Sequence, residues 1–352
     1  NWTDPAVGVS FETANPATAE PIAKICQGTV EHVEAAVAAA RVAQPGWWDL
    51  GSHARARYLY AIARKIQKHA RLLAVLESMD NGKPIRESRD LDIPLVARHF
   101  YHHAGWAQLM EDELPDYEPL GVVGQIIPWN FPIHTTIQKL APALYAGNAL
   151  IVKPSPYTPL ATLRAMEHLR SVLPPGLVQT LAGGDALGQA LVKASGIDKV
   201  SFTGSTPTGR AVMAASAPSL KHLTLELGGN DAGIVLADAD PREIAPLLVR
   251  SAFNNSGQVC HALKRLYVPS TLHDALAEEL VSAASKLKVG DGFDAETDLG
   301  PLANRAQFDI VCRLVEDARE RGARVLCGGA PLDRPGTFYP PTLLTDCTES
   351  MA

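Results

Sequence analysis

The chain has 352 residues, of which 46% are hydrophobic and 20% are charged, as in a globular protein with two or three domains. Its net charge of -6 comes from mixed signs without a basic stripe, and no apolar run approaches the roughly 20 residues that span a bilayer, so neither nucleic-acid nor membrane binding is expected. The five cysteines are odd in number and contain no C-x-x-C pair, which argues against a disulfide framework or a zinc site and predicts a reducing, cytoplasmic location.

The first third of the sequence is expected to be helical. Apolar residues at helical spacing predict one helix after Thr29 that Pro45-Gly46 ends, one from Ser52 toward Met79, and one over about residues 92–111.

From Gly121 onward, short apolar segments alternate with amphipathic ones. Strands are expected at residues 121–127, 149–153, 177–181, 199–202 and 222–227, with helices at 135–145, 161–171, 186–194 and after Thr206. Such alternation predicts an α/β fold with a Rossmann-type parallel sheet, in which ligands bind at the carboxyl ends of the strands. A second α/β series follows, with strands at 233–236 and 264–268 and helices at 241–253, 272–287 and 305–321. We therefore expect a boundary at Gly228-Gly229, with one domain over residues 1–228 and another over 229–352.

A glycine turn lies between a predicted strand and helix at residues 199–209. Thr206 is expected to cap the helix, with Pro207 in its first position, and Gly204 lets a ligand approach the backbone. Free N–H groups at a helix start suit a phosphate, although an ordinary tight turn has the same sequence pattern.

A cysteine lies on a polar, glycine-containing loop at residues 257–260. Such a position suits an accessible nucleophilic thiol at Cys260, while the alternative is a small buried hydrophobic residue. Cys312 and Cys327 fall within a predicted helix and strand, where burial is the expected role.

Three polar side chains lie at or just after predicted strand ends. Glu226 follows leucines, so partial desolvation would make it a stronger general base; the alternative is a solvated charge. Asn130 lies in a rigid loop between two prolines and suits donation to an oxyanion, or it bonds its own backbone. Lys153 suits a ribose or phosphate, or it is a solvated charge.

Taken together, these segments resemble the aldehyde dehydrogenase superfamily, and the resemblance covers nearly the whole chain. The motifs that carry it are Asp80–Pro84, Pro128–Pro132, Ala141–Leu144 with Gly147-Asn148, Lys153-Pro154, Phe202–Ser205 with Gly209, Glu226–Gly229 and Gly257–Cys260.

The resemblance implies oxidation of a small-molecule aldehyde to a carboxylic acid with NAD or NADP. Cys260 would form a thiohemiacetal, Asn130 and the Cys260 backbone N–H would hold the oxyanion, and Glu226 would activate the water that hydrolyses the thioester. Lys139 would support the site from nearby. Implied cofactor contacts are Ile127, Pro128, Trp129, Lys153, Ser155, Gly183, Gly204, Ser205, Leu227 and Gln307. A homodimer or homotetramer is also implied.

The sequence departs from the family in two places. Many members carry a glutamate where this chain has Pro156, and that glutamate favours NAD, so NADP is not excluded here. The chain also stops before a family motif that contacts the nicotinamide ribose, which suggests a catalytic domain incomplete at its C-terminus, and residues 113–120 suggest only a stub of an oligomerisation hairpin. A non-catalytic dehydrogenase-like protein that binds a nucleotide or subunits is therefore the alternative.

Three histidines cluster at helical spacing at His99, His102 and His103. No carboxylate or cysteine pattern accompanies them, and we expect packing and surface roles rather than a metal site.

Overall fold

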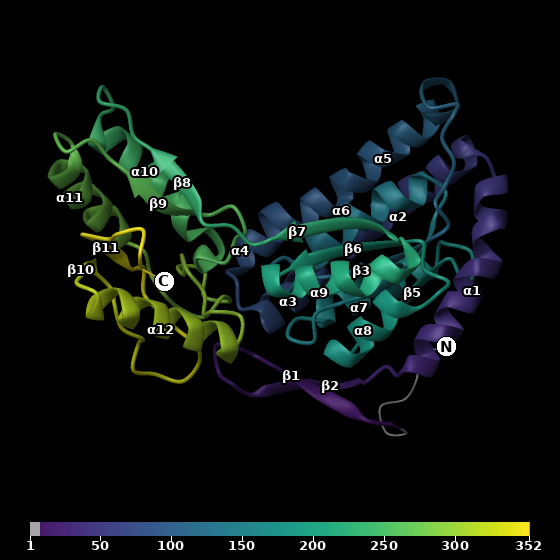
Figure 1. The fold of residues 1–352 in the computed structure, drawn as a ribbon, viewed down its shortest axis with the longest axis horizontal. Helices are drawn as coiled ribbons and strands as arrows, with labels where there is room; N and C mark the ends of the chain where they lie inside the picture. Colours follow the sequence, from purple (N-terminus) through teal and green to yellow (C-terminus); the bar gives the residue numbers. More distant parts are fainter. Residues whose placement is uncertain (1–7, 352) are drawn as a thin grey trace. The chain divides into compact units, whose positions relative to one another are not determined.

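The computed structural model describes residues 8–351 as two compact units (Figure 1). The first unit comprises residues 8–13, 21–80 and 88–227, and the second comprises residues 14–20, 81–87 and 228–351. The main division falls between Leu227 and Gly228. Two short segments that the sequence placed in the first domain, residues 14–20 and 81–87, belong to the second unit.

The first unit is built on a five-stranded parallel sheet, which confirms the predicted α/β class. The strand order is β5-β4-β3-β6-β7. The strands are β3 (Val122–Ile126), β4 (Ala149–Lys153), β5 (Val178–Thr180), β6 (Lys199–Gly204) and β7 (His222–Leu227). The order reverses direction beside β3, and in open parallel sheets such a reversal marks a ligand-binding crevice at the strand carboxyl ends.

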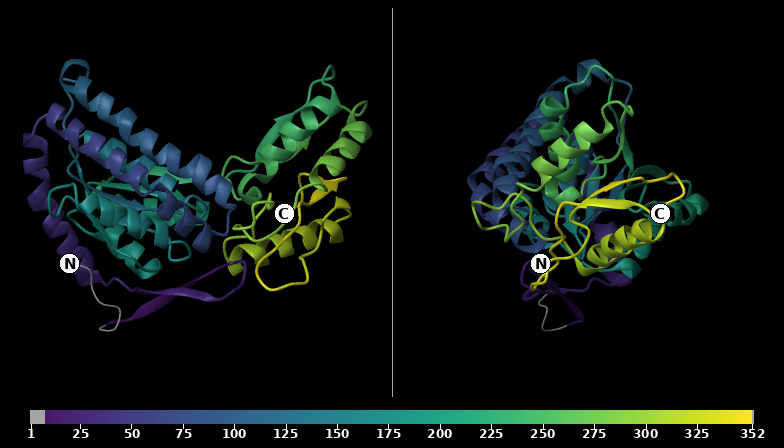
Figure 2. Two further views of the ribbon diagram at one scale, coloured as in Figure 1. Left: turned by 180° about the vertical axis from the view of Figure 1, so that it is seen from behind. Right: turned by 90° about the vertical axis from the view of Figure 1, so that its left-hand side faces the viewer.

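Helices cover both faces of this sheet (Figures 1 and 2). One face carries α1 (Val30–Asp49), α8 (Asp185–Lys193) and α9 (Thr206–Ser216). The other carries α6 (Pro132–Tyr145) and α7 (Leu160–Arg170), with α2 (Ser52–Lys68) and α5 (Ile93–Glu113) packed outside them. β4, which lies inside the sheet, is buried along its whole length, as expected for a strand covered on both faces.

The first helix does not end at Pro45-Gly46, so that prediction was wrong. Helix α1 continues to Asp49 with Pro45 inside it. Trp47 is 1% exposed, and its indole N–H donates to the Leu144 carbonyl at 2.9 Å. Burial of this large aromatic residue favours four more helical residues over the local cost of the proline.

The second predicted helix is divided in two. It breaks at His69, which ends α2 before α3 (Ala70–Asn81) begins. The His69 ring stacks on the His168 ring with centroids 4.0 Å apart. A short helix, α4 (Ile85–Glu87), and a π-helical turn at residues 88–92 then lead into α5. The sequence pattern did not predict either of these elements.

A strand pair near the start of the described chain was also not predicted. β1 (Ser10–Ala14) and β2 (Pro21–Cys26) form a two-stranded sheet, although the first third of the sequence was expected to be helical. At residues 114–120, where an oligomerisation hairpin stub was expected, the chain forms a turn and irregular structure without a strand.

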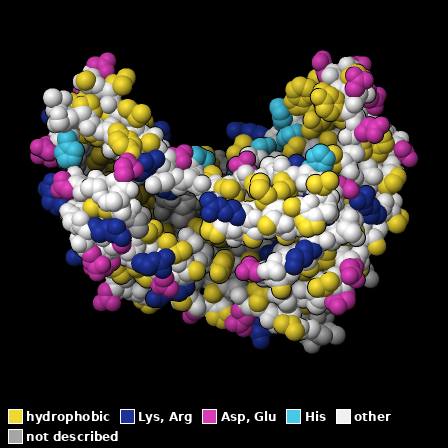
Figure 3. Space-filling model, viewed as in Figure 1, with side chains coloured by type: hydrophobic (Ala, Val, Ile, Leu, Met, Phe, Trp, Pro, Cys, Tyr) yellow, Lys and Arg dark blue, Asp and Glu magenta, His cyan; other side chains and the backbone are white. Residues whose placement is uncertain are grey.

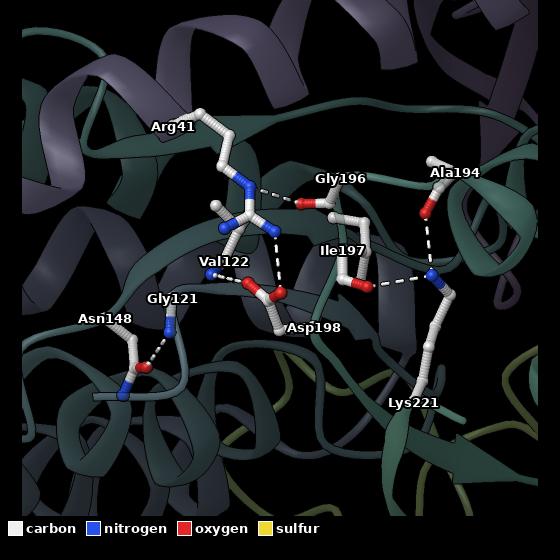
Figure 4. Close-up of polar contacts among 9 residues, drawn as sticks. All are labelled: Arg41, Gly121, Val122, Asn148, Ala194, Gly196, Ile197, Asp198 and Lys221. Carbon is white, nitrogen blue, oxygen red and sulfur yellow. Dashed lines mark hydrogen bonds and ion pairs between the residues drawn. The ribbon is translucent and has the colours of Figure 1, made fainter. Parts of the chain in front are cut away.

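A polar network fixes the amino ends of the sheet strands (Figure 4). The Asp198 carboxylate accepts hydrogen bonds from the Val122 N–H at 2.7 Å and from Arg41 of α1 at 2.6 Å. Asn148 accepts from the Gly121 N–H at 3.0 Å, and Lys221 donates to the carbonyls of two residues in the turn before β6. These bonds tie β3, β4, β6 and β7 together at the end of the sheet opposite the strand carboxyl ends.

The second unit has a smaller α/β core. Its elements are β8 (Asp231–Ile234), α10 (Pro241–Phe253), β9 (Leu263–Tyr267), α11 (His273–Ala284), α12 (Arg305–Glu320), β10 (Arg324–Cys327) and β11 (Leu343–Thr345). β8 and β9 are parallel, and β10 and β11 are antiparallel. Two apolar clusters stabilise it, one beneath α10 and α11 and one where α12 packs on Tyr339.

The two short segments join the second unit through backbone hydrogen bonds. The Thr337 N–H donates to the Pro16 carbonyl at 2.9 Å, and the Ile85 N–H donates to the Gly292 carbonyl at 2.8 Å. Gly82, at φ +86°, lies so close to Gly300 that a side chain at Gly300 would strike its carbonyl. Among residues 8–351, no helix has the length and hydropathy of a membrane span.

Candidate active site

Strand register brings several candidate residues to one edge of the sheet in the first unit. Ile126 of β3 pairs with Lys153 of β4 and with Phe202 of β6. One residue further along, Thr203 pairs with Glu226 of β7. The loops that carry Asn130, Ser155 and Ser205 therefore leave the sheet at the same carboxyl edge, where parallel sheets bind ligands.

The loop that contains Asn130 is held in place from both sides. The Thr158 hydroxyl donates to the Trp129 carbonyl at 3.0 Å, and the Ile133 N–H at the start of α6 donates to the buried Glu77 carboxylate at 3.4 Å. Asn130 itself is half-buried. α6 begins at Pro132, three residues earlier than predicted, because proline suits the first turn of a helix.

Lys139 and Glu226 interact electrostatically within the first unit. Burial lowers the pKa of Lys139, and the negative charge of Glu226 opposes that shift. Glu226 is exposed, so the desolvation that the leucine-rich strand predicted is absent, because β7 is the edge strand of the sheet. The Lys139 ammonium is thus a positively charged group that attracts the Glu226 carboxylate.

Lys153 is a buried cation at the end of β4. It is 5% exposed, and burial lowers its pKa to about 8, with a smaller opposing effect from Asp185. Its ammonium donates to the Pro154 carbonyl at 3.3 Å. A buried ammonium with one long hydrogen bond retains donors for a ligand, which corrects the alternative of a solvated charge.

The remaining predicted contacts of β3, β4 and β5 lie in ordered loops. The Ile127 N–H donates to the Lys153 carbonyl at 3.0 Å, and Pro128 follows it in the loop. Ser155 is buried, and its hydroxyl accepts from the Tyr157 N–H at 3.3 Å. At Gly183, a Cβ atom would lie 2.6 Å from the Gln27 side-chain nitrogen, so a larger residue would require that side chain to move.

The turn after β6 differs from the prediction in its cap. Ser205, not Thr206, is the N-cap of α9, and its hydroxyl accepts from the Thr208 N–H at 3.3 Å. The reason is that Thr206 already has helical geometry and Pro207 occupies the second position. A Cβ at Gly204 would lie 2.6 Å from the Phe202 ring, and Leu227 packs against α9 at Gly209.

This edge of the sheet fits the adenosine and phosphate parts of a dinucleotide. The hydroxyls of Thr180 and Thr203 are buried and lack hydrogen-bond partners within the described chain. Buried hydroxyls without partners are uncommon in folded proteins. Lys153 and the N-terminus of α9 offer a positive charge and a helix start, which suit a polar, anionic cofactor.

Cys260 lies at the tip of a turn in the second unit. The Ala262 N–H donates to the Val259 carbonyl at 3.1 Å, which leaves Cys260 and His261 as the two central residues. Both side chains are exposed. The expectation of an accessible thiol therefore agrees with the geometry, and burial as a small hydrophobic residue does not.

An unusual backbone precedes this turn. Asn255 and Ser256 have φ values of 48° and 55°, and Gly257 has a φ of 77°. Left-handed conformations at non-glycine residues cost about 1–3 kcal/mol each and gather at functional sites. The Ser256 hydroxyl offsets part of this cost by donating to the Gly300 carbonyl at 2.8 Å, and Gln258 accepts from the Ala303 N–H at 2.8 Å.

Two side chains beside Cys260 were not singled out from the sequence. The His261 Nδ1 lies 3.5 Å from the Cys260 Sγ, and the Lys264 ammonium donates to the Cys260 carbonyl at 3.4 Å. Their positions one and four residues after the cysteine were the available signal. Gln307, the last predicted cofactor contact, is half-buried in the first turn of α12, where its N–H donates to the Asn304 cap at 3.0 Å.

The histidine cluster of α5 gains a fourth member from α6. His99 and His134 approach to 3.3 Å between their Nε2 atoms, and His134 packs edge-on against Phe131 of the Asn130 loop. Figure 3 shows histidine side chains gathered on this face of the first unit. Within the described residues, no group of three or more His, Cys, Asp or Glu side chains is arranged to hold a metal.

Comparison with known proteins places the chain among enzymes of one kind. The sequence model of the aldehyde dehydrogenase family matches residues 2–352. Retinaldehyde dehydrogenase 3 of Rattus norvegicus is 38% identical over 100% of this chain and 72% of its own length. The aldehyde dehydrogenase of Agaricus bisporus is 36% identical over 99% of this chain and 73% of its own length.

Solved structures agree with the sequence comparison. The NAD+ complex of an aldehyde dehydrogenase from Bacillus cereus matches with a TM-score of 0.95 and 37% identity, over 100% of this chain and 74% of that one. The NAD+ complex of betaine aldehyde dehydrogenase from Staphylococcus aureus matches with a TM-score of 0.95 and 34% identity, over 100% and 73%. These matches agree with the motifs at Asn130, Glu226 and Cys260: the chain belongs to the aldehyde dehydrogenase family.

Proposed function

We propose that the NAD(P)-dependent aldehyde oxidation of this family runs in this chain through Cys260, Asn130 and Glu226. The observation that carries the proposal is the exposed Cys260 thiol at the tip of a turn that follows a strained backbone segment. The family match over residues 2–352 also favours the enzyme over a non-catalytic binding protein.

The first step joins the enzyme to its substrate. The Cys260 thiolate attacks the aldehyde carbon, an S–C bond forms, and the carbonyl π electrons move to oxygen. The Asn130 side-chain amide and the Cys260 backbone N–H donate to that oxyanion. A nucleophile is needed first because an aldehyde carbon releases hydride readily only once it is tetrahedral.

NAD(P)+, when bound, supplies the acceptor for that hydride. Lys153 and Ser205 would hold its adenosine ribose and pyrophosphate, Gly204 would let it approach the backbone closely, and Gln307 would contact its nicotinamide ribose. Ile127, Pro128, Trp129, Ser155, Gly183 and Leu227 complete its surroundings.

Glu226 completes turnover. As a carboxylate it accepts one proton from water, whose oxygen attacks the Cys260 thioester, and the C–S bond breaks to release the carboxylic acid and the Cys260 thiolate, leaving the proton on Glu226. Lys139 positions Glu226 by attraction between their opposite charges, which the lysine's pKa reflects.

The role of Cys260 is tested by Cys260→Ala. We expect aldehyde-dependent NAD(P)H formation to fall to background, because the candidate site then lacks the thiol that forms the thiohemiacetal. Cys347→Ala is the matched control, since Cys347 is also exposed but lies outside the candidate site. Turnover of Cys260→Ala near that of the unaltered chain would reject the assignment.

We also propose a cytoplasmic homodimer or homotetramer. The five free cysteines suit a reducing compartment. Trp106 and Leu109 of α5 are 41% and 49% exposed, and large exposed apolar side chains of this kind suit a subunit contact. Light scattering after gel filtration should give twice or four times the monomer mass; a monomer at micromolar concentration would contradict the oligomer.

A further inference from the structure

The turn that carries Cys260 also carries a proton acceptor for its thiol. The His261 Nδ1 lies 3.5 Å from the Cys260 Sγ, which is hydrogen-bond distance for sulfur. The two residues are the central pair of the Val259–Ala262 turn. Both are exposed, so a proton can also exchange with solvent.

A lysine beneath the same turn provides a fixed positive charge. The Lys264 ammonium donates to the carbonyls of Val259 at 3.0 Å, Ala262 at 3.2 Å and Cys260 at 3.4 Å. Burial lowers the pKa of Lys264, while Asp231 and the negative form of Cys260 raise it. The hydrogen bond to the Cys260 carbonyl keeps this positive charge beside the residue, where it attracts a negatively charged sulfur.

A negative charge nearby, the Asp231 carboxylate, disfavours a negatively charged sulfur at Cys260. A Cβ atom at Gly229 would strike both the Asp231 carboxylate and the Cys260 carbonyl, so Asp231 lies against the same segment. Asp231 also interacts with Lys264. The charged and titratable groups that the second unit places around this turn are therefore His261, Lys264 and Asp231.

We propose that His261 is a catalytic base that takes the thiol proton of Cys260, and that Lys264 stabilises the resulting thiolate. In this step the S–H bond breaks and its electrons stay on sulfur, while an N–H bond forms at Nδ1. The step transfers a proton and changes no oxidation state, and its product is a Cys260 thiolate beside a His261 imidazolium. The proposal rests on Cys260 being the nucleophile.

The proposal divides two proton transfers between two bases. His261 serves the thiol before aldehyde attack, and Glu226 serves the water in deacylation. In the product of the first transfer, the positive imidazolium of His261 lies beside the negative sulfur of Cys260, and attraction between these charges stabilises the nucleophile.

The test measures alkylation of Cys260 by iodoacetamide from pH 5 to 10 in the full chain, without aldehyde or cofactor. Mass spectrometry of peptides gives the rate constant at Cys260 and, in the same sample, at the exposed Cys347. We expect His261→Asn to lower the Cys260 rate constant at pH 7 by about tenfold, with the two chains converging above about pH 9.5. The rate at Cys347 should not change, nor should His53→Asn in the other unit alter either rate.

Equal Cys260 profiles for the unaltered chain and His261→Asn would overturn the proposal. His261 is exposed, so the variant should fold; its circular dichroism melting curve checks this, and His261→Gln is the second variant. If neither variant folds, the unaltered chain decides: a single rise of reactivity centred near pH 8.5 would also overturn it.

The alkylation result separates this proposal from the proposed function. If Cys260→Ala retained full aldehyde oxidation, Cys260 would not be the nucleophile, whatever its alkylation profile. If Cys260→Ala were inactive while His261→Asn left the alkylation profile unchanged, the nucleophile would stand and its base would not be His261.

Discussion

Burial distinguishes Lys153 from the other candidate cofactor contacts. Its pKa is lowered to about 8, mainly by burial, so in the chain without ligand the ammonium loses its proton as pH rises through about 8. Hydroxyl and phosphate oxygens favour the charged form, so binding of NAD+ should raise the pKa again. We therefore predict net proton uptake when NAD+ binds between about pH 8 and 9.

Titration calorimetry in two buffers of different ionisation enthalpy measures this uptake. Lys153→Met should abolish it, whereas Lys199→Gln, which alters another partly buried lysine of the same sheet, should not. Undiminished uptake in Lys153→Met would show that the proton goes elsewhere.

Glu226 is an exposed carboxylate, so its proposed role depends on position rather than on desolvation. Glu226→Gln should leave the first-turnover burst of NAD(P)H and slow the steady state about 100-fold or more, because water attack on the thioester then lacks its base. Rapid-mixing kinetics separates the two phases. Glu278→Gln, an exposed residue of α11, is the control, and loss of the burst itself would assign Glu226 to the first step instead.

Pro156 bears on the choice of cofactor. A carboxylate there would repel a 2′-phosphate, and proline does not. Pro156→Glu should therefore raise the ratio of kcat/KM for NAD over NADP about tenfold, since 1.4 kcal/mol of repulsion corresponds to that factor. Steady-state kinetics with both cofactors measures the ratio, and an unchanged ratio would mean that the ribose lies away from Pro156.

At the scale of elements, Asp198 is the residue on which the amino ends of β3 and β6 depend. Asp198→Ala removes the acceptor for the Val122 N–H and the partner of Arg41. We expect the free energy of unfolding to fall by about 1–3 kcal/mol, because a buried donor loses its partner. Urea denaturation measures the change.

Asp309→Ala is the control for this effect. Asp309 pairs with Arg305 one helical turn away, at side-chain exposures of 53% and 75%. Exposed pairs contribute little, so its loss should cost under about 1 kcal/mol. An equal loss of unfolding free energy in Asp198→Ala and Asp309→Ala would show that the Asp198 network does not stabilise the sheet.

The elements show where sequence reasoning succeeds and where it fails. The strands of the parallel sheet were predicted to within about two residues because each is a buried apolar run bounded by polar turns. The predicted helix end at Pro45 was wrong because Trp47 is buried against residues distant in the sequence, and this packing outweighs the local effect of a helix-breaking proline. β1 and β2 were missed because exposed strands carry little apolar alternation.

At the scale of the molecule, candidate residues occur in both units, each of which is described by its own geometry. Asn130, Lys153, Ser205 and Glu226 were predictable as residues at strand ends, since parallel register brings such positions to one edge. Cys260 was distinguished only by resemblance to the family. His261 and Lys264 were missed because a contact within a turn depends on backbone angles, which no spacing rule gives.

The central claim is that the substrate becomes covalently attached to Cys260. The most direct measurement is acid quenching of the chain during turnover of an aldehyde with NAD+, followed by mass spectrometry of its peptides. We predict an acyl group on the Cys260 peptide, at higher occupancy in Glu226→Gln, where the thioester persists. NADH formation with an unmodified Cys260 peptide, or with the acyl group on another residue, would contradict the account.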